Sequence, residues 1–277
     1  MKRSPQMKHD LAMIEWRGRS IGIEHQWINR ERSGAPLLLF LHEGLGSLSL
    51  WRNFPARLCD AAGVQGLVFS RYGYGRSSTR PAHEQWGGDF MQVQALELIP
   101  AFLAAAGVPA EQELWLFGHS DGGSIALIMA AHNPSRYCGV IVTAPHTSIE
   151  SLTAQGVACA RQAFEDGGSR AALARHHDDA QSVVTGWADS WLTPDGLAWT
   201  IEPLLASITC PVLAIQGEQD AFGTLEQVRV IRRQAPQTQL LELEGRGHVP
   251  HFEDPQAVIR ASVSFIRSVS QARAAHA

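Results

Sequence analysis

A serine flanked by glycines, in Gly118–Gly123 (GHSDGG), is the residue of this sequence best placed for nucleophilic chemistry. The apolar run Glu113–Phe117 directly precedes this motif, and a helix-like stretch, Asp121–Ala131, overlaps its end. A sharp turn from a strand into a helix lifts a serine hydroxyl above the sheet and directs unpaired helix N–H groups at its surroundings. The flanking glycines remove side chains where the two backbones crowd together. We therefore predict that Ser120 is a nucleophile.

The same Gly-x-Ser-x-Gly pattern occurs a second time, at Gly18–Gly22. In a chain with 25 glycines the bare pattern is weak evidence. No buried strand precedes this copy and no helix follows it, and its position suits a hairpin turn. We assign it no catalytic role.

A serine nucleophile needs an adjacent base, which in turn needs an orienting partner. The chain holds twelve histidines, so position must decide among them. His248 follows the predicted strand Gln239–Leu243, and strand ends on one edge of a parallel sheet face the same side. We predict His248 as the base, with His251 as the main competitor. His119, next to the serine, is expected to point the other way and to have a structural role.

The orienting acid is expected to follow a strand as well. Asp220 comes a few residues after the predicted strand Pro211–Gln216, and Glu218 is the alternative. Glu253 and Asp254 fit the N-terminus of the final helix, where acids offset the helix dipole. The order serine, acid, histidine is the one expected for this kind of turn, so we predict Asp220.

Acyl transfer also needs N–H donors for the oxyanion, and losing one typically costs about 3 kcal/mol of transition-state stabilisation. One is expected to be the backbone N–H of Asp121. The other is expected in the loop His42–Ser47, after the apolar run Pro36–Leu41. Gly44 is the first choice there, and Leu45 is the second.

Short β-rich runs alternate with helix-like segments over most of the chain, which predicts an α/β fold with a mostly parallel, twisted central sheet and helices on both faces. The expected strands are Ser20–Ile28, Pro36–Leu41, Gln65–Ser70, Glu113–Phe117, Gly139–Thr143, Pro211–Gln216 and Gln239–Leu243. The expected helices are Leu50–Ala62, Asp89–Ala106, Asp121–Ala131, Leu225–Gln234 and Pro255–Ala272.

Between His146 and Thr209 the sequence shows only helix-like pieces separated by turns, among them a good helix start at Thr193–Asp195. Because the strand–helix pattern continues on both sides, we predict a core domain formed by 1–145 and 210–277, with a helical cap inserted at 146–209. Trp187 and Trp191 in this cap, with Trp199 on the next predicted helix, are expected to pack on the sheet or to line an apolar pocket.

The composition excludes several function classes. The net charge is −4 and the pI about 6.3, with no sign of a nucleic-acid footprint. The polar start, 1–11, does not resemble a secretory signal, and no apolar stretch is long enough to span a bilayer. The four cysteines form no C-x-x-C pair, so we expect reduced thiols in a cytoplasmic protein. No sequence feature indicates an oligomeric state.

Two motifs could suggest a bound group. His176–Asp179 (HHDD) contains metal-ligand residue types, but adjacent helix residues point in different directions and no H-x-x-x-H companion exists. The glycines and serines of Arg71–Ser78 resemble a phosphate loop, but no P-loop lysine is present. We expect no metal and no cofactor.

From about Leu37 to the last helix the sequence resembles the α/β-hydrolase superfamily. The resemblance rests on the early His-x-Gly-x-Gly loop, the RYGYGRSS motif, the GHSDGG turn, the late Asp and the late Gly-x-Gly-His. It implies a triad of Ser120, Asp220 and His248, and a lid inserted after the sixth strand of the fold.

The sequence also departs from relatives within this superfamily. Many have His-Gly where this chain has His42-Glu43, which places a carboxylate near the mouth of the site. The serine at 120 argues against haloalkane dehalogenases and epoxide hydrolases, which use an aspartate. Carbon–carbon hydrolases of aromatic-ring degradation usually carry Asn-Ser-Met-Gly-Gly at the turn and an aromatic residue after the histidine, where this chain has Val249.

We therefore expect a serine hydrolase that cleaves a carboxylic ester or thioester of a small to medium acyl group through an acyl-serine intermediate. The expected partner is a small ester-like molecule, and neither nucleic acid nor membrane. The alternatives are a carbon–carbon hydrolase of ring-cleavage products, a cofactor-free haloperoxidase or lyase on the same fold, and a ligand receptor.

Overall fold

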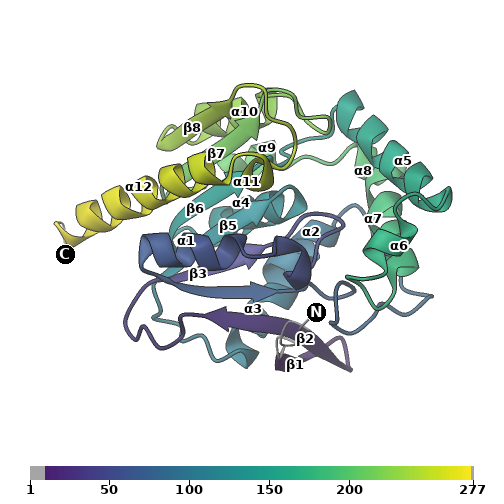
Figure 1. Ribbon diagram of the computed structural model, residues 1–277, viewed down its shortest axis with the longest axis horizontal. Coiled ribbons are helices and arrows are strands. Elements are labelled where there is room, and N and C mark those ends of the chain that lie inside the picture. The colour runs from purple at the N-terminus through teal and green to yellow at the C-terminus, as the bar shows by residue number, and fades with distance from the viewer. Residues whose placement is uncertain (1–9, 276–277) are drawn as a thin grey trace, which may run out of the picture.

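The computed structural model describes residues 10–275 of the chain. Its centre is a twisted sheet of eight strands in the order β1-β2-β4-β3-β5-β6-β7-β8 (Figure 1). β2 pairs antiparallel with both β1 and β4, and all other neighbours are parallel. The strands are β1 Asp10–Trp16, β2 Arg19–Ile28, β3 Leu37–Leu41, β4 Gln65–Phe69, β5 Leu114–His119, β6 Tyr137–Thr143, β7 Val212–Gly217 and β8 Thr238–Leu243.

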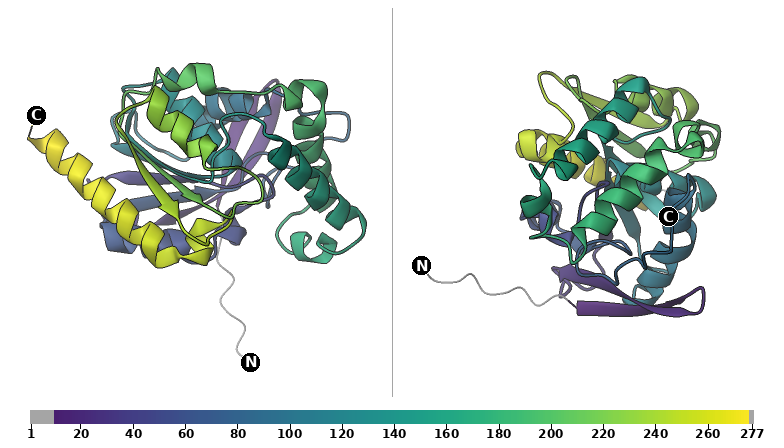
Figure 2. Two further views of the ribbon diagram at one scale, coloured as in Figure 1. Left: turned by 90° about the horizontal axis from the view of Figure 1, so that it is seen from above. Right: turned by 90° about the vertical axis from the view of Figure 1, so that its right-hand side faces the viewer.

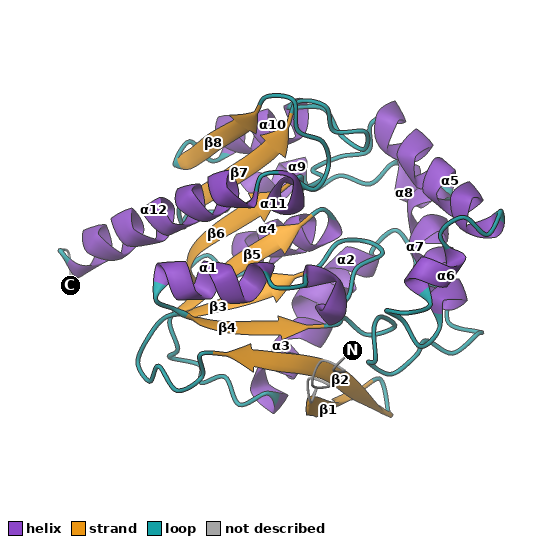
Figure 3. Ribbon diagram, viewed as in Figure 1, coloured by secondary structure: helices purple, strands orange, loops and turns teal. Residues whose placement is uncertain are grey.

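The strands β3 to β7 are buried along their whole length, which explains why they appear in the sequence as short continuous apolar runs. The predicted α/β class, with its mostly parallel sheet, is confirmed. In Figure 3 the arrowheads of these parallel strands all point toward the same edge of the sheet. Loops that leave this edge therefore lie side by side although they are far apart in the sequence.

The first strand, β1, was not predicted. It forms a hairpin with β2 through a turn in which Arg17 and Gly18 both have positive φ, 49° and 74°. The second copy of the Gly-x-Ser-x-Gly pattern starts at this turn, as predicted. In β1 only Ala12 and Ile14 are buried, while the alternate residues Leu11 and Met13 are exposed. The strand therefore has no continuous apolar run by which it could be recognised.

Helices cover both faces of the sheet (Figure 2). One apolar layer lies under α1 and α12, and the other lies under α3, α4 and α10. The bounds are α1 Phe54–Ala62, α2 Phe90–Val93, α3 Ile99–Ala105, α4 Asp121–His132, α10 Glu226–Gln234, α11 Pro250–Glu253 and α12 Pro255–Ala274, with a 3-10 turn η1 at Leu48–Trp51. The predicted helix Asp89–Ala106 is interrupted by a π-helical turn, η2 Gln94–Leu98, just before Pro100, which has no N–H to donate.

Between β6 and β7 the chain forms five helices, α5 Ser151–Glu165, α6 Arg170–Leu173, α7 Ala180–Leu192, α8 Pro194–Leu197 and α9 Glu202–Leu205. Figure 1 shows α5 to α8 beyond the edge to which the parallel strands point. Thr193 caps α8, since its side chain accepts a hydrogen bond from the Gly196 N–H. α9 packs against α4 and α10, so the segment rejoins the sheet layers before β7 begins.

Within residues 10–275, no helix is long and apolar enough to cross a membrane.

Candidate active site

Ser120 sits in a strained turn between β5 and α4. Its backbone angles are φ 52° and ψ −121°, a conformation that costs a non-glycine residue about 1–3 kcal/mol. The two glycines of the motif are required by close packing. A Cβ on Gly118 would lie 2.2 Å from the Gly122 carbonyl oxygen, and one on Gly122 would lie 2.0 Å from that of Leu41. The turn thus holds the serine hydroxyl at the carboxyl edge of the sheet.

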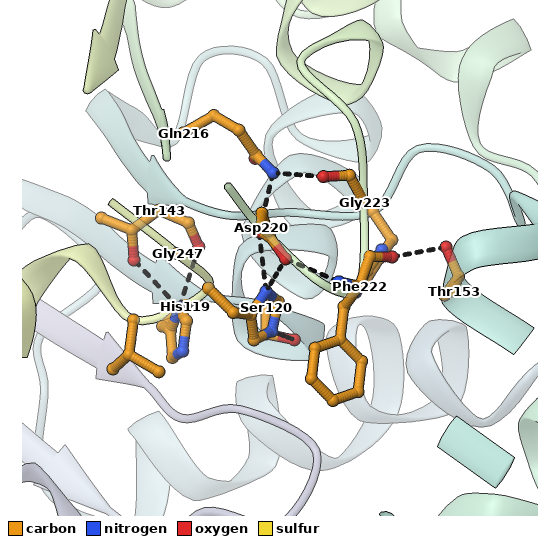
Figure 4. Close-up of polar contacts among 12 residues, drawn as sticks. His119, Ser120, Thr143, Thr153, Gln216, Asp220, Phe222, Gly223 and Gly247 are labelled. Carbon is orange, nitrogen blue, oxygen red and sulfur yellow. Dashed lines mark hydrogen bonds and ion pairs between the residues drawn. The ribbon is translucent and has the colours of Figure 1, made fainter. Parts of the chain in front are cut away.

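The three predicted side chains Ser120, His248 and Asp220 form one hydrogen-bonded line. Ser120 and Asp220, at its two ends, are labelled in Figure 4. His248 Nε2 lies 3.0 Å from Ser120 Oγ, and His248 Nδ1 lies 2.8 Å and 2.9 Å from the two carboxylate oxygens of Asp220. Because a carboxylate only accepts, Nδ1 donates to Asp220, which leaves Nε2 free to accept the serine proton. This arrangement can deprotonate the hydroxyl of Ser120.

Asp220 is held by its own neighbours. Its carboxylate accepts hydrogen bonds from the Phe222 N–H at 2.7 Å and from Gln216 Nε2 at 2.8 Å (Figure 4). The carboxylate is buried, and these donors fix its orientation toward His248. Gln216 is the last but one residue of β7, and Phe222 lies in the following loop, so one strand end provides both the acid and the groups that orient it.

The alternative acids and bases lie elsewhere. Glu218 is exposed, and the ring of His251 is buried against Trp51 and Phe54, behind the line. His119 is turned toward the Thr143 carbonyl oxygen, 3.0 Å from its Nδ1, as predicted for a structural residue.

Asp254 lies at the start of the final helix, as predicted, whereas Glu253 is the last residue of α11, and the two acids have separate structural roles. Asp254 caps α12 by accepting from the Ala257 N–H, which agrees with its predicted position. The Glu253 carboxylate accepts from the N–H groups of Gly247 and Val249. It therefore supports the loop on both sides of His248, a role that the sequence did not reveal.

Three further histidines surround His248. The ring centres of His119 and His146 lie 5.2 Å and 5.9 Å from that of His248, and the ring of His251 lies 4.6 Å from that of His119. Burial, with repulsion from His248, lowers the pKa of His146 and of His251 to about 3. Burial also holds the pKa of His119 well below its usual value. These rings are therefore neutral at pH 7.

The loop expected to donate to the oxyanion is fixed from outside. The Glu43 carbonyl oxygen lies 2.8 Å from Arg71 Nη2 and 2.8 Å from His42 Nδ1. In a trans peptide the N–H of the next residue points opposite to the carbonyl, so the Gly44 N–H is directed away from Arg71 and His42. Gly44 and Leu45 both line the cavity that contains Ser120. The choice of Gly44 as the first donor and Leu45 as the second stays a prediction.

The second expected donor, the N–H of Asp121, begins α4, where the first N–H groups have no partner within the helix. The Asp121 carboxyl is buried, and its Oδ2 lies 3.7 Å from Arg71 Nη2. Burial raises the pKa of this carboxyl, and the Arg71 guanidinium opposes the rise. Arg71 itself is fully buried and stacks on Tyr74, 4.5 Å from its ring centre, so the RYGYGRSS motif supports both donor loops.

A cavity of about 140 Å³ opens onto Ser120 and His248. Its surface is largely apolar. The remaining lining residues are Glu43, Gly44, Leu45, Asp121, His146, Thr153, Val157, Ala160, Trp187, Trp191 and Phe222. Trp187 packs directly on the oxyanion loop, since a Cβ on Gly44 would lie 2.0 Å from its Nε1. Trp187 and Trp191 therefore line the pocket, which is the second of the two expectations, whereas Trp199 packs against Trp191.

His146 and Phe222 were not recognised from the sequence as parts of the site. Each lies in the loop after a strand, β6 or β7, and this position at the carboxyl edge was the available signal.

The His176–Asp179 segment has structural partners. His177 accepts from the Gly75 N–H through Nδ1 and donates from Nε2 to the Leu45 carbonyl oxygen, 3.0 Å away in each case. Asp178 pairs with Arg76, and Asp179 caps α7. No three His, Cys, Asp or Glu side chains within the described part of the chain are grouped so that they could hold a metal ion. The segment thus connects the helices between β6 and β7, through hydrogen bonds, to the loop His42–Ser47, in which an oxyanion donor is expected.

Comparison with known proteins places this architecture in a family. A family model described as "Alpha/beta hydrolase family" matches residues 38–261. A 2-succinyl-6-hydroxy-2,4-cyclohexadiene-1-carboxylate synthase of Salmonella enteritidis PT4 (strain P125109) is 27% identical over 259 residues, covering 84% of this chain and 95% of that protein.

Solved structures agree on the fold. A bacterial membrane phospholipase A superposes with a TM-score of 0.75 at 20% identity, covering 95% of this chain and 87% of its own. The esterase RhEst1 from Rhodococcus sp. ECU1013 has a TM-score of 0.70 at 21% identity, covering 95% of this chain and 100% of its own. The family match extends over most of the sheet and all three residues of the hydrogen-bonded line, and this chain belongs to the alpha/beta hydrolase family.

Proposed function

We propose that this enzyme hydrolyses a carboxylic ester or thioester with a small to medium acyl group, using Ser120 as nucleophile, His248 as base and Asp220 as orienting acid. The observation that carries the proposal is the unbroken hydrogen-bonded line from the Ser120 hydroxyl to the Asp220 carboxylate, at the wall of a largely apolar cavity. A serine, a base and an orienting acid in this order constitute the machinery of acyl transfer.

In the proposed reaction, Ser120 Oγ attacks the carbonyl carbon of the substrate while His248 Nε2 takes the serine proton. The negative charge that forms on the carbonyl oxygen is stabilised by the N–H groups of Gly44 and Asp121, with Leu45 as the alternative donor. His248 then gives its proton to the departing alcohol or thiol, which leaves an acyl group on Ser120. A water molecule, deprotonated by His248, releases the acid and restores the serine.

The size and position of the cavity support a small substrate. Pockets for drug-sized ligands measure roughly 300–1,000 Å³, and this cavity is about 140 Å³. Trp187 and Trp191 come from α7, and Val157 and Ala160 from α5, so helices between β6 and β7 form one wall. We propose that the segment 146–209 acts as the cap that selects the acyl group.

The direct test is covalent labelling by a fluorophosphonate probe. We expect wild-type protein to be labelled, Ser120→Ala not to be labelled, and His248→Ala to hydrolyse p-nitrophenyl acetate slower by about 10⁴-fold or more, because the hydroxyl has lost its base. His251→Ala is the matched control, since this ring lies outside the line. Wild-type turnover in His248→Ala would contradict the assigned base, and absence of any labelling would contradict a working nucleophile.

A second candidate is carbon–carbon bond chemistry, because the curated relative at 27% identity is named as a synthase of a cyclohexadiene carboxylate. In such a reaction we propose that the line would remove a proton, with no acyl group on Ser120. The name of that relative's product includes a succinyl group and a carboxylate, but no Lys or Arg lines the cavity in the described part of this chain. Mass spectrometry of the protein quenched during ester turnover distinguishes the two, because only ester hydrolysis adds an acyl mass to Ser120.

A further inference from the structure

One ionisable side chain of the cavity has no part in the proposed reaction. Glu43 directly precedes the expected oxyanion donor Gly44 and lines the same cavity as Ser120. Its carboxylate lies over Gly46, where a Cβ would come within 2.5 Å of Oε2. The Glu43 backbone carbonyl is bound to Arg71 and His42, which fixes the Cα from which the side chain extends. The contacts that fix the backbone of this loop therefore also fix the point from which the carboxyl group extends.

The charges around the cavity are unbalanced. Two of the lining residues, Glu43 and Asp121, carry carboxyl groups, and none in the described chain is Lys or Arg. The neighbouring cation is Arg71, which is fully buried, binds the Glu43 carbonyl oxygen and lies 3.7 Å from Asp121. A substrate in the cavity therefore lies beside carboxyl groups, while the cation nearest to them is buried outside the lining.

The rest of the lining offers an anion little compensation. Much of the lining is apolar surface, from Trp187, Trp191, Phe222, Val157 and Ala160. Moving a charged group from water to such a surface is costly unless an opposite charge or a hydrogen bond compensates it. The neighbouring His146 is neutral at pH 7, because burial lowers its pKa to about 3. The N–H groups of the oxyanion loop are occupied by the carbonyl oxygen of the ester itself in the proposed reaction.

We propose that Glu43 is a specificity-determining residue that excludes negatively charged substrates, so that the site takes uncharged, apolar esters. This inference rests on the proposed function where it concerns hydrolysis. Its statement about binding is independent of hydrolysis, because binding can be measured in a variant that lacks the nucleophile.

The experiment compares two ethyl esters of closely similar shape. Ethyl 4-methylpentanoate ends in an isopropyl group, and ethyl hydrogen succinate has a carboxylate in the same place. Both are titrated into Ser120→Ala protein, followed by tryptophan fluorescence, since Trp187 and Trp191 line the cavity. The buffer is held at pH 8, because burial raises the pKa of Glu43 from its usual value of 4.5. We expect the neutral ester to bind at least about tenfold more tightly, as like charges within one cavity repel strongly at low effective dielectric.

Adding Glu43→Gln, which keeps the shape of the side chain, is expected to reduce this preference by about tenfold, mainly through tighter binding of the anion. Adding Glu218→Gln, which removes an exposed acid two residues before Asp220, is expected to leave the preference unchanged. Equal binding of the two esters by the Ser120→Ala protein overturns the proposal. So does an unchanged preference after Glu43→Gln, or the loss of binding of both esters, because Glu43 would then serve the integrity of the cavity.

Turnover of both esters by otherwise wild-type and Glu43→Gln enzymes is measured in parallel. We expect Glu43→Gln to reduce the preference in kcat/KM for ethyl 4-methylpentanoate over ethyl hydrogen succinate by about tenfold. An unchanged preference in kcat/KM overturns the assignment of Glu43 to specificity. If the wild type binds the neutral ester selectively but hydrolyses no ester, the proposed function fails and the charge selection by Glu43 stands.

Discussion

At the scale of single residues, the site depends on how firmly its proton-handling groups are oriented. Asp220 accepts from Phe222 and Gln216 as well as from His248, so its carboxylate cannot rotate without breaking buried hydrogen bonds. This bonding keeps the Nδ1 proton of His248 on the side of Asp220 and the lone pair of Nε2 on the side of Ser120.

Asp220→Asn tests this orientation. The amide has the size of the carboxyl but presents an N–H group that His248 Nδ1–H cannot bond to, so the ring is expected to change tautomer or orientation. We expect kcat for p-nitrophenyl acetate to fall by about 10³–10⁴-fold, with KM little changed. Glu218→Gln, in the same loop but exposed, is the control. A loss below tenfold in Asp220→Asn would show that the acid has been wrongly identified.

The residues of the line could be predicted because each combines a distinctive type with a position just after a strand. His146 also lies three residues beyond β6, but a chain with twelve histidines gives no local reason to select it. Trp187 and Trp191 could be placed on a helix, but their approach to Gly44 depends on how α7 packs over the sheet edge, which no local pattern encodes.

At the scale of elements, the junction of β5 and α4 is one of the places where a non-glycine residue has a positive φ. Ser120 at φ 52° adopts a conformation that glycine tolerates far better, while its neighbours Gly118 and Gly122 have no room for a side chain. The turn between β5 and α4 thus holds the Ser120 hydroxyl in place at a cost to the free energy of unfolding.

Comparison of Ser120→Gly with Ser120→Ala isolates the strain, because both lack the hydroxyl and only alanine keeps a Cβ. We expect the free energy of unfolding of Ser120→Gly to exceed that of Ser120→Ala by about 1 kcal/mol. This value allows for the greater freedom of glycine in the unfolded chain. For a protein of this size that corresponds to about 2 °C in Tm, measured by calorimetry. An Ala variant that melts at the same temperature as the Gly variant, or higher, would show that the turn carries no such strain.

The elements themselves were largely predictable, since β3 to β7 are continuous apolar runs bounded by turns. β1 was missed because its sheet face contributes only Ala12 and Ile14 to the core, a signal too short to separate from a polar terminus. The division into a core and a cap at 146 and 209 stays a prediction, and the packing of α9 on α4 and α10 shows that the end of this segment contacts the sheet layers.

At the scale of the whole molecule, the fold keeps an unusual number of histidines neutral. Burial lowers the pKa of His42, His119, His146, His177 and His251, to about 3 for His146 and His251 and to about 4 for His177. Between these values and the usual 6.5, the unfolded chain binds protons that the folded chain does not, so the free energy of unfolding rises with pH.

Two buried carboxyls act in the opposite direction. Burial raises the pKa of Glu43 and of Asp121, so the folded state binds protons there that the unfolded state releases above about pH 4. Burial also lowers the pKa of His176, so six histidines with a lowered pKa outnumber these two carboxyl groups. The net result is stability that is fully present above pH 6.5 and is lost progressively as the pH falls toward 3.

Urea denaturation between pH 4 and 7.5 measures this loss, and His251→Phe identifies one source of it. The ring of His251 packs among Trp51, Phe54 and Phe252, so a phenyl group suits the site and removes one titrating group. Below pH 6, the free energy of unfolding of this variant is expected to fall less steeply than that of the wild type, by about 1.4 kcal/mol per pH unit. His83→Phe, at an exposed position, is expected to keep the wild-type slope. Identical slopes in His251→Phe and wild type would mean that His251 is already protonated in the folded protein, and the buried histidines would then not be the cause of its acid sensitivity.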